Sequence, residues 1–214
     1  MDKIVLKNTL PDIFASETTI RSSVWKQHIC FDRGQYYLIE ANSGTGKSSL
    51  CSYLYGYRDD YSGDILFDDN IIRKQKAGFW DDIRCRHLSL LFQELCLFPE
   101  LTALENVLLK NNLTGYKTVS QIEAMFARLD IAEKKDALIG KMSWGQQQRV
   151  ALIRSLCQPF DFIILDEPIS HLDDDNARVM TDLLAEEAAS QGAGIIATSI
   201  GKHLPLGYSQ TLSL

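Results

Sequence analysis

The stretch Ala41-Asn42-Ser43-Gly44-Thr45-Gly46-Lys47-Ser48 decides the fold, because its residues are typical of a phosphate-binding loop. It follows an apolar run with strand character, Tyr36-Tyr37-Leu38-Ile39-Glu40, and precedes a helical pattern, Ser49-Leu50-Cys51-Ser52-Tyr53-Leu54. Small residues let backbone N–H groups curl around phosphate oxygens, and the helix N-terminus adds unpaired donors and a positive dipole end. This strand, loop and helix predict a nucleotide-binding site.

Within this loop, Lys47 is expected to reach the β- and γ-phosphates, and the Ser48 hydroxyl is expected to ligate Mg²⁺. Ala41 stands where the usual pattern has glycine, and the competing interpretation is a Gly/Ser-rich turn before an ordinary helix. The strand and helix on either side favour nucleotide binding. The residues expected to contact the nucleotide here are Ala41, Asn42, Ser43, Gly44, Thr45, Gly46, Lys47, Ser48 and Ser49.

Length and composition are those of an ordinary globular protein of one large domain, with 214 residues, 45% hydrophobic and 23% charged. The net charge is −6 and the basic residues are scattered, so we expect no nucleic-acid partner. No window approaches the ~20 consecutive apolar residues that cross a bilayer. The five cysteines lack paired spacing, which indicates free thiols rather than a metal cluster.

Strand and helix patterns alternate along much of the chain, which predicts a parallel α/β sheet with its ligands beyond the carboxyl ends of the strands. The pattern is interrupted between Glu94 and about Lys141, where helices follow one another without strands. There, Thr102 followed by Glu105 indicates a capping box. The expected strands are at residues 4–8, 27–31, 36–40, 64–67, 88–93, 160–165 and 194–198. The expected helices are at residues 49–54, 103–110, 120–129, 145–157 and 174–191.

A second motif, Phe162-Ile163-Ile164-Leu165-Asp166-Glu167-Pro168, ends an apolar strand with two carboxylates. Asp166 is expected to orient Mg²⁺, and Glu167 to polarise the water that attacks the γ-phosphorus. An Asp-Glu pair after a strand is otherwise typical of a helix cap or a solvated strand end. The phosphate loop upstream favours the catalytic interpretation.

Taken together, these motifs resemble the nucleotide-binding domain of ATP-binding cassette (ABC) proteins over nearly the whole chain. Gln93 resembles the family's Q-loop glutamine, which contacts Mg²⁺, and Phe14 falls about where an aromatic stacks on adenine. Met142-Ser143-Trp144-Gly145-Gln146-Gln147-Gln148-Arg149 resembles the Leu-Ser-Gly-Gly-Gln signature. Ile169-Ser170-His171-Leu172-Asp173 resembles the D-loop, with Asp173 its aspartate. Phe98 to Val107 resembles the small export and lipoprotein-release type of ATPase subunit.

The resemblance implies a single ABC ATPase domain over residues 1–214. Its P-loop NTPase core would be α/β, with a parallel sheet and an N-terminal antiparallel β portion, over residues 1–92 and 142–214. An all-helical lobe would be inserted at residues 93–141. The implied catalytic residues are Glu167, Gln93 and Lys47, and the implied Mg²⁺ ligands are Ser48, Gln93 and Asp166.

The resemblance also implies the partners. Two copies would sandwich ATP head to tail, each nucleotide between one phosphate loop and Ser143, Gly145, Gln146 and Asp173 of the second copy. An integral membrane permease would hold the protein at the cytoplasmic face of the membrane and would dock on the helical lobe.

Two departures from the family pattern bear on catalysis. Trp144 replaces a signature glycine, and a bulky residue is disfavoured there if the backbone needs a positive φ. The switch histidine that contacts the γ-phosphate is missing, because its position falls on Ser199 or Ile200. His203 would substitute only if the intervening loop folds back, and it is otherwise a surface histidine. We therefore expect slow ATP hydrolysis.

Several functions remain open at this stage. The leading hypothesis is the ATPase subunit of a transporter or membrane complex. The alternatives are a soluble ABC ATPase that acts on nucleic acid or ribosomes, and a regulatory module with little turnover. A P-loop kinase would leave the signature and the D-loop unexplained.

Overall fold

A computed structural model describes residues 1–17, 19–169 and 174–214, and these residues contain two β-sheets. The antiparallel sheet has the order β2-β1-β4-β5, formed by β1 (Lys3–Pro11), β2 (His28–Asp32), β4 (Tyr61–Phe67) and β5 (Asn70–Ile71). The parallel sheet has the order β6-β7-β8-β3-β9, formed by β3 (Tyr36–Glu40), β6 (Leu88–Leu91), β7 (Phe162–Asp166), β8 (Gly194–Ser199) and β9 (Gln210–Ser213).

The helices fall between these strands. The α-helices are α1 (Lys47–Leu54), α2 (Ala77–Asp82), α3 (Ala103–Asn111), α4 (Val119–Arg128), α5 (Trp144–Leu156) and α6 (Asp174–Gln191). Short 3-10 turns are η1 (Asp12–Phe14), η2 (Ile72–Lys74), η4 (Ala132–Lys134) and η5 (Ile139–Lys141). A π-helical segment, η3 (Ile83–His87), leads into β6.

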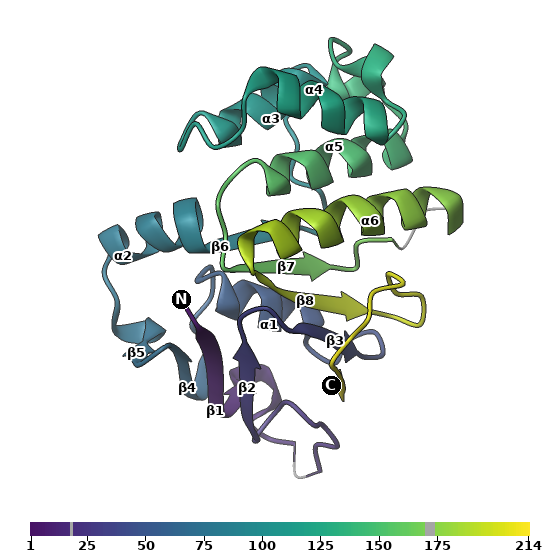
Figure 1. Ribbon diagram of the computed structural model, residues 1–214. Helices are drawn as coiled ribbons and strands as arrows, with labels where there is room; N and C mark the ends of the chain where they lie inside the picture. Colours follow the sequence, from purple (N-terminus) through teal and green to yellow (C-terminus); the bar gives the residue numbers. More distant parts are fainter. Residues whose placement is uncertain (18, 170–173) are drawn as a thin grey trace.

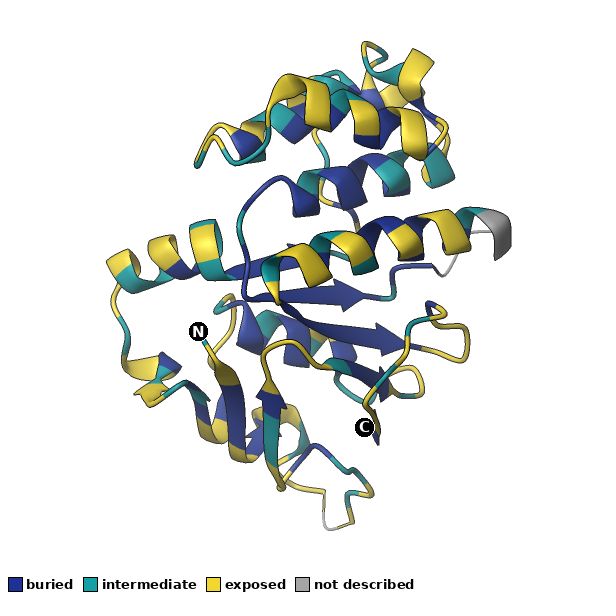
Figure 2. Ribbon diagram, viewed as in Figure 1, coloured by how far each residue is buried: buried dark blue, intermediate teal, exposed yellow. Residues whose placement is uncertain are grey.

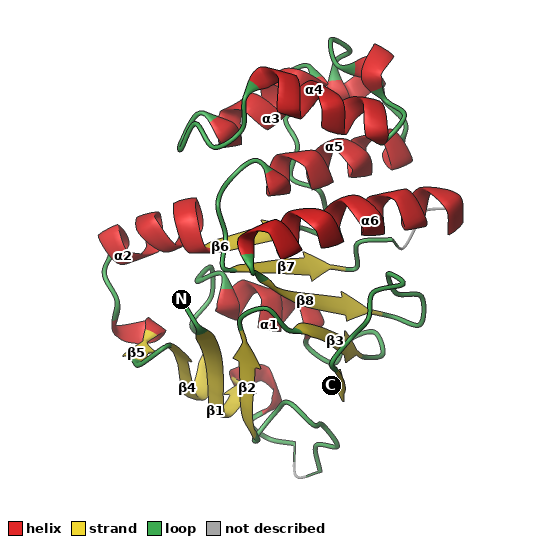
Figure 3. Cartoon of the chain, in the orientation of Figure 1, coloured by secondary structure: helices red, strands yellow, loops and turns green. Residues whose placement is uncertain are grey.

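The elements are stacked in layers (Figure 1). Helices α5 and α6 cover one face of the parallel sheet, and α3 and α4 lie beyond α5. Helix α1 lies on the other face, towards the antiparallel sheet. Figure 3 shows that helices α3 and α4, between β6 and α5 in the chain, stand apart from the strands.

Two hydrophobic clusters fill the space between the layers, and β7 contributes to both. Ile163 and Leu165 belong to the cluster under α5 and α6, whereas Phe162 and Ile164 belong to the cluster around α1. Alternate side chains of a strand point to opposite faces, so a strand covered on both faces needs a continuous apolar run. Figure 2 shows this strand buried throughout.

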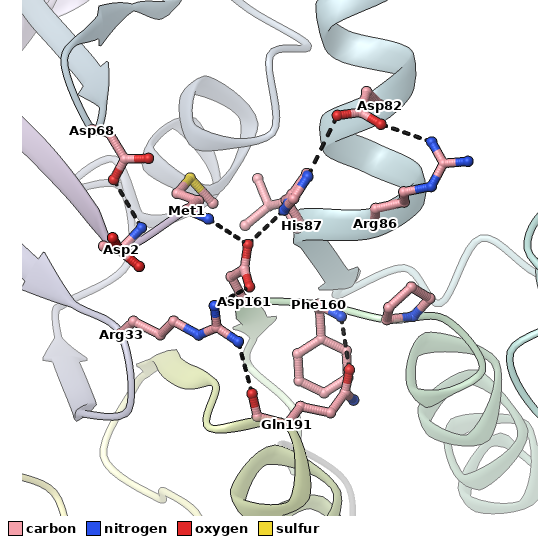
Figure 4. A network of polar contacts seen from close by, with 12 residues as sticks. Met1, Asp2, Arg33, Asp68, Asp82, Arg86, His87, Phe160, Asp161 and Gln191 are labelled. Carbon is pink, nitrogen blue, oxygen red and sulfur yellow. Dashed lines mark hydrogen bonds and ion pairs between the residues drawn. The ribbon is translucent and has the colours of Figure 1, made fainter.

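A network of polar contacts around the Asp161 carboxylate joins the two sheets (Figure 4). One carboxylate oxygen accepts hydrogen bonds from the Met1 amine, at 2.7 Å, and contacts His87 Nδ1 at 2.5 Å. The other lies 2.7 Å from Arg33 Nη1. Arg33 also donates to the backbone oxygens of Gln191 and Gly192, at the end of α6. Asp161, just before β7, therefore contacts segments that are far apart in the sequence.

The predicted fold class is confirmed, with a parallel sheet, an antiparallel sheet of mainly N-terminal strands, and helices inserted after β6. Each predicted strand and helix is present within a few residues, including the capping box of α3. The elements without a prediction include β5, α2, η3 and β9. Among the described residues, no helix combines the length and the apolar character that a bilayer span needs.

Candidate functional site

The phosphate loop lies between β3 and α1, at the carboxyl end of β3. Gly44 and Gly46 have φ values of 82° and 98°, which bend the chain sharply into the helix that begins at Lys47. Among the hydrogen bonds of the described residues, none has a backbone amide of residues 44–49 as its donor. A loop with this set of unpaired N–H groups at a helix N-terminus fits an anion such as a phosphate.

Two aromatic side chains pack against the loop. Trp25 is buried and donates a hydrogen bond from Nε1 to the Thr45 carbonyl at 3.1 Å. A Cβ atom built on Gly46 would lie 3.1 Å from ring carbons of both Trp25 and Phe14. Phe14 is half-buried against the loop, whereas its neighbour Ile13 is 73% exposed. Both residues face the space above the loop.

That space is a cavity of about 330 Å³. Its walls come from η1, the phosphate loop, the segment after β6, and the segments after β7 and β8. The lining residues are Ile13, Phe14, Ser43, Gly44, Gly46, Lys47, Ser48, Ser49, Gln93, Glu167 and Ile200. Residues from five separate parts of the chain thus meet here, as expected where parallel strands end at one edge of a sheet.

Lys47 is buried and crosses the cavity floor. Its Nζ donates to the Asn42 carbonyl at 3.2 Å and lies 3.5 Å from a carboxylate oxygen of Glu167. The start of α1 and the segment after β7, which are far apart in the sequence, therefore bring an ammonium group and a carboxylate close to each other. The ammonium stays in the part of the cavity next to the free amides of the loop, where a phosphate would meet it.

Three oxygen-bearing side chains expected at a Mg²⁺ site lie close to one another. Ser48 Oγ donates to Gln93 Oε1 at 3.5 Å, and Ser48, Gln93 and Asp166 line an adjoining cavity of about 190 Å³. No cluster of three or more His, Cys, Asp or Glu side chains able to hold a metal occurs among the described residues. This set suits Mg²⁺, which takes few protein ligands and completes its shell with water and phosphate oxygens.

Asp166 is the last residue of β7 and Glu167 follows it, so both lie at the carboxyl end of this strand, as the sequence predicted. The Thr198 hydroxyl on β8 donates to Asp166 Oδ1 at 2.8 Å, and Thr198 had no predicted role. Its proximity depends on the register of β7 and β8, which pairs Asp166 with Thr198. The register of the two strands would be needed to predict that Thr198 contacts Asp166, and no local sequence pattern gives it.

The signature residues lie elsewhere, at the N-terminus of α5. Ser143 accepts a hydrogen bond from the Gln146 amide at 3.4 Å, and the Gln146 side chain accepts one from the Ser143 amide at 3.0 Å. This capping box explains why the helix begins at Trp144. Neither Ser143, Gly145 nor Gln146 lines the cavity.

Trp144 is compatible with this position because it is the first residue of a right-handed helix and its φ is not positive. The concern that a bulky residue would be strained there is therefore removed. Its side chain is 44% exposed beside Ser143. Further along α5, the buried Gln148 donates from Nε2 to the Pro168 carbonyl, which connects this helix to the segment after β7.

The remaining predicted residues are placed as follows. The Ala41 amide donates to the Ser199 carbonyl at 3.1 Å, so Ala41 lies at the base of the loop rather than in the cavity. The Ser49 hydroxyl accepts from Arg58 at 3.1 Å. Asn42 contacts Lys47 through its carbonyl, and Thr45 Oγ1 donates to the same carbonyl at 2.9 Å. Asp173 lies outside the described residues.

His203 lies away from the cavity. Its Nδ1 is 3.1 Å from the Leu204 carbonyl, and its ring packs edge-on against Tyr208 with the centroids 5.7 Å apart. Ile200, at 46% exposure, lines the cavity instead. An apolar side chain therefore lines the cavity at one of the two positions, Ser199 and Ile200, where the resemblance placed the switch histidine.

Comparisons with known proteins agree with this geometry. The family model described as ABC transporter matches residues 26–170. The uncharacterized ABC transporter ATP-binding protein YclH of Bacillus subtilis is 32% identical over 173 residues, which is 79% of this chain and 75% of YclH. The lipoprotein-releasing system ATP-binding protein LolD of Syntrophotalea carbinolica is 30% identical over 186 residues, which is 86% of this chain and 82% of LolD.

A solved structure shares the fold. The dimeric structure of MJ0796, described as a bacterial ABC transporter cassette, matches with a TM-score of 0.76 and 23% identity over 92% of this chain and 87% of that chain. The family model covers well over half of the chain, and the two relatives extend the match over most of it. The chain therefore belongs to the ABC transporter family, as one of its ATP-binding proteins.

Proposed function

We propose that this protein is the subunit that binds and hydrolyses ATP for a membrane transporter, working as a head-to-tail dimer. One observation carries the proposal. A single cavity gathers the free amides of the phosphate loop, the Lys47 ammonium, Gln93 and the Glu167 carboxylate. These are the groups needed to bind a triphosphate and to orient a water molecule against it.

Each group has a distinct task in this proposal. The amides of residues 44–49 and the Lys47 ammonium bind the phosphate oxygens. Ser48, Gln93 and Asp166 would hold Mg²⁺, which when bound neutralises the charge of the phosphates. Glu167 orients the attacking water and accepts its proton. Phe14 and Ile13 offer an apolar wall to the base of the nucleotide.

The second half of each site would come from another copy of the chain. Ser143, Gly145 and Gln146 lie outside the cavity of their own chain, at an exposed helix N-terminus that suits a phosphate. In a head-to-tail dimer they would close over the nucleotide of the partner, together with Asp173. The relative MJ0796 is described as a dimer, which supports this arrangement.

The membrane partner would dock between the core and the helical lobe at residues 93–141. A cavity of about 330 Å³ lies at this junction, and three exposed apolar side chains line it, Tyr57, Phe98 and Leu109. Contiguous exposed apolar groups are typical of protein interfaces. The protein would then act at the cytoplasmic face of the membrane, and the LolD relative suggests the small export and lipoprotein-release type.

The decisive experiment measures ATP turnover and dimer formation together. Wild type should hydrolyse ATP slowly. Glu167→Gln should lower the rate about 10²-fold or more, as expected on removing a general base. Glu133→Gln, on an exposed glutamate far from the cavity, is the matched control. Light scattering should show that ATP doubles the mass of Glu167→Gln. Equal rates for wild type and Glu167→Gln would refute the role of Glu167.

A second candidate is a regulatory ABC protein with little turnover. The apolar Ile200 in the cavity wall and the distant His203 favour it, because the γ-phosphate then lacks one donor from its own chain. Purification from detergent-solubilised membranes distinguishes the two. A membrane permease that copurifies supports the transporter subunit, whereas a protein that stays unpartnered and binds ATP without turnover supports the regulatory alternative.

A further inference from the structure

The Thr198 hydroxyl group, on β8, makes two hydrogen bonds. Their partners are Asp166 and Glu167, the two residues whose carboxylates belong to the candidate site. The hydroxyl donates to Asp166 Oδ1 at 2.8 Å and accepts from the backbone N–H of Glu167 at 3.2 Å. Thr198 is only 1% exposed. The hydroxyl therefore uses its donor and one acceptor position on two consecutive residues, the last residue of β7 and the residue after it.

The second of these residues has an unusual backbone. Glu167 has a φ of 50°, in the left-handed region that non-glycine residues rarely adopt. Two side chains from other elements hold this turn. Thr198 accepts from the Glu167 amide, and Gln148 on α5 donates to the Pro168 carbonyl. From this backbone, the Glu167 carboxylate reaches to 3.5 Å from Lys47 Nζ.

We propose that Thr198 is a positioning residue that sets the Asp166 carboxylate and the Glu167 backbone in one fixed geometry. This inference rests on the function proposed above. One hydroxyl couples the carboxylate that would hold Mg²⁺ to the residue that would orient water, so a change at Thr198 alters metal dependence and turnover together. Mutation of a residue that hydrogen-bonds to a metal ligand typically lowers metal affinity or activity 10–100-fold.

The test compares Thr198→Val, which keeps the branched shape but removes the hydroxyl, with Thr198→Ser, which keeps the hydroxyl. Thr198→Val should lower kcat about 10–100-fold and raise the Mg²⁺ concentration needed for half-maximal ATP binding by a similar factor. ATP binding measured without Mg²⁺ should stay within about twofold of wild type, because the loop amides and Lys47 are unchanged. Thr198→Ser should restore both quantities to within a few-fold of wild type.

A matched control is available in Thr181 on α6. Thr181 is also buried, and its hydroxyl donates to the Ala177 carbonyl at 2.7 Å, one turn earlier in the same helix. Thr181→Val removes a buried hydroxyl far from the cavity. It should change the free energy of unfolding without a specific change in Mg²⁺ dependence.

A readout without nucleotide tests the geometry itself. Hydrogen–deuterium exchange at the Glu167 amide should be faster in Thr198→Val than in wild type and Thr198→Ser, because the acceptor of that N–H is lost. Unchanged exchange together with unchanged Mg²⁺ dependence would overturn the inference. The inference would also be overturned if Thr198→Val and Thr181→Val lost activity in proportion to their loss of stability, with no difference between the two variants.

The two proposals fail in different ways. If wild type does not hydrolyse ATP while Mg²⁺ dependence of binding and amide exchange change as expected, the proposed turnover is wrong and the positioning role stands. If wild type hydrolyses ATP and Thr198→Val matches it in kcat and Mg²⁺ dependence, the positioning role is wrong and the proposed function stands.

Discussion

The ammonium group of Lys47 lies 3.5 Å from a carboxylate oxygen of Glu167, at the floor of the candidate site. One residue comes from the phosphate loop and the other follows β7, and both side chains are largely buried. In the proposed function, Lys47 binds phosphate and Glu167 orients water. A phosphate entering the cavity therefore competes with Glu167 for the lysine, and the carboxylate repels it.

This relationship predicts that Glu167→Gln binds ATP more tightly than wild type. The change removes the repulsion and frees Lys47, and we expect a roughly tenfold lower Kd for ATP, which corresponds to about 1.4 kcal/mol. Titration with a fluorescent ATP analogue measures this Kd. Glu133→Gln should bind like wild type. A weaker Kd for Glu167→Gln would contradict a competition between carboxylate and phosphate.

The two glycines of the loop give a second prediction. Gly44→Ala and Gly46→Ala place a side chain at similar positive φ values, which costs each about 1–2 kcal/mol. Only at Gly46 would the new Cβ meet other atoms, at 3.1 Å from the rings of Phe14 and Trp25. We expect Gly46→Ala to lose a further 1 kcal/mol or so of stability from overpacking, and to lose more ATP affinity.

Urea denaturation and nucleotide titration of both glycine variants provide the measurement. The difference between the two variants isolates the aromatic contact, because the backbone strain is common to both. Equal stabilities and equal affinities would mean that Phe14 and Trp25 move aside freely.

The Asp161 network predicts a stability effect distant from the cavity. Asp161→Asn removes the charge that faces Arg33 and the Met1 amine, and leaves the buried Met1 amine without a counter-ion. We expect a loss of roughly 3 kcal/mol in the free energy of unfolding. Urea denaturation measures it, and Asp69→Asn, at an exposed site, is the control. A change below about 0.5 kcal/mol would show that the network adds no net stability.

Much of this architecture follows from local sequence signals. The run of apolar residues in β7 predicts burial on both faces, and the Thr102–Glu105 pair predicts where α3 begins; both are confirmed. The loop at residues 41–48 predicts a turn between strand and helix, which is also present. Such signals are readable because each depends on neighbours a few residues apart.

Other features depend on contacts that no local pattern encodes. Strand β9 has a single buried residue, Leu212, and forms by pairing with β3, more than a hundred residues away in the sequence. Helix α2 has no side-chain cap, and its aromatic residues Phe79 and Trp80 pack on Phe67. The Thr198 hydroxyl meets Asp166 only because parallel register places them opposite each other. The role of Phe14 at adenine stays a prediction.

The capping box of α3 predicts a pH effect. The backbone N–H and the hydroxyl of Thr102 donate to the Glu105 carboxylate and hold the pKa of that carboxyl below its ordinary value. Because the pKa of the Glu105 carboxyl is lower in the folded state, the ionised carboxylate stabilises the fold when the pH is above the ordinary pKa of this group. This contribution is lost as the pH falls through the lowered pKa.

Wild type and Glu105→Gln should therefore differ most in unfolding free energy near neutral pH. Glutamine keeps an oxygen that accepts the same hydrogen bonds, so the difference reports the charge alone. Denaturation from about pH 7 down to about pH 3 should show the two proteins converging as Glu105 becomes protonated. Glu100→Gln, at an exposed position nearby, is the control. A constant difference across this range would contradict the assignment.

The wall of the cavity opposite the phosphate loop gives the last prediction. Ile200 faces the cavity, whereas the His203 ring packs on Tyr208 and its Nδ1 meets the Leu204 carbonyl. If slow hydrolysis reflects a missing donor to the γ-phosphate, His203→Ala leaves kcat unchanged and Ile200→His raises it, by up to about 10²-fold. Ile200→Leu is the control for altered packing. Steady-state ATP turnover decides between these outcomes, and a large loss in His203→Ala would mean that the loop after β8 folds back and brings this histidine to the nucleotide.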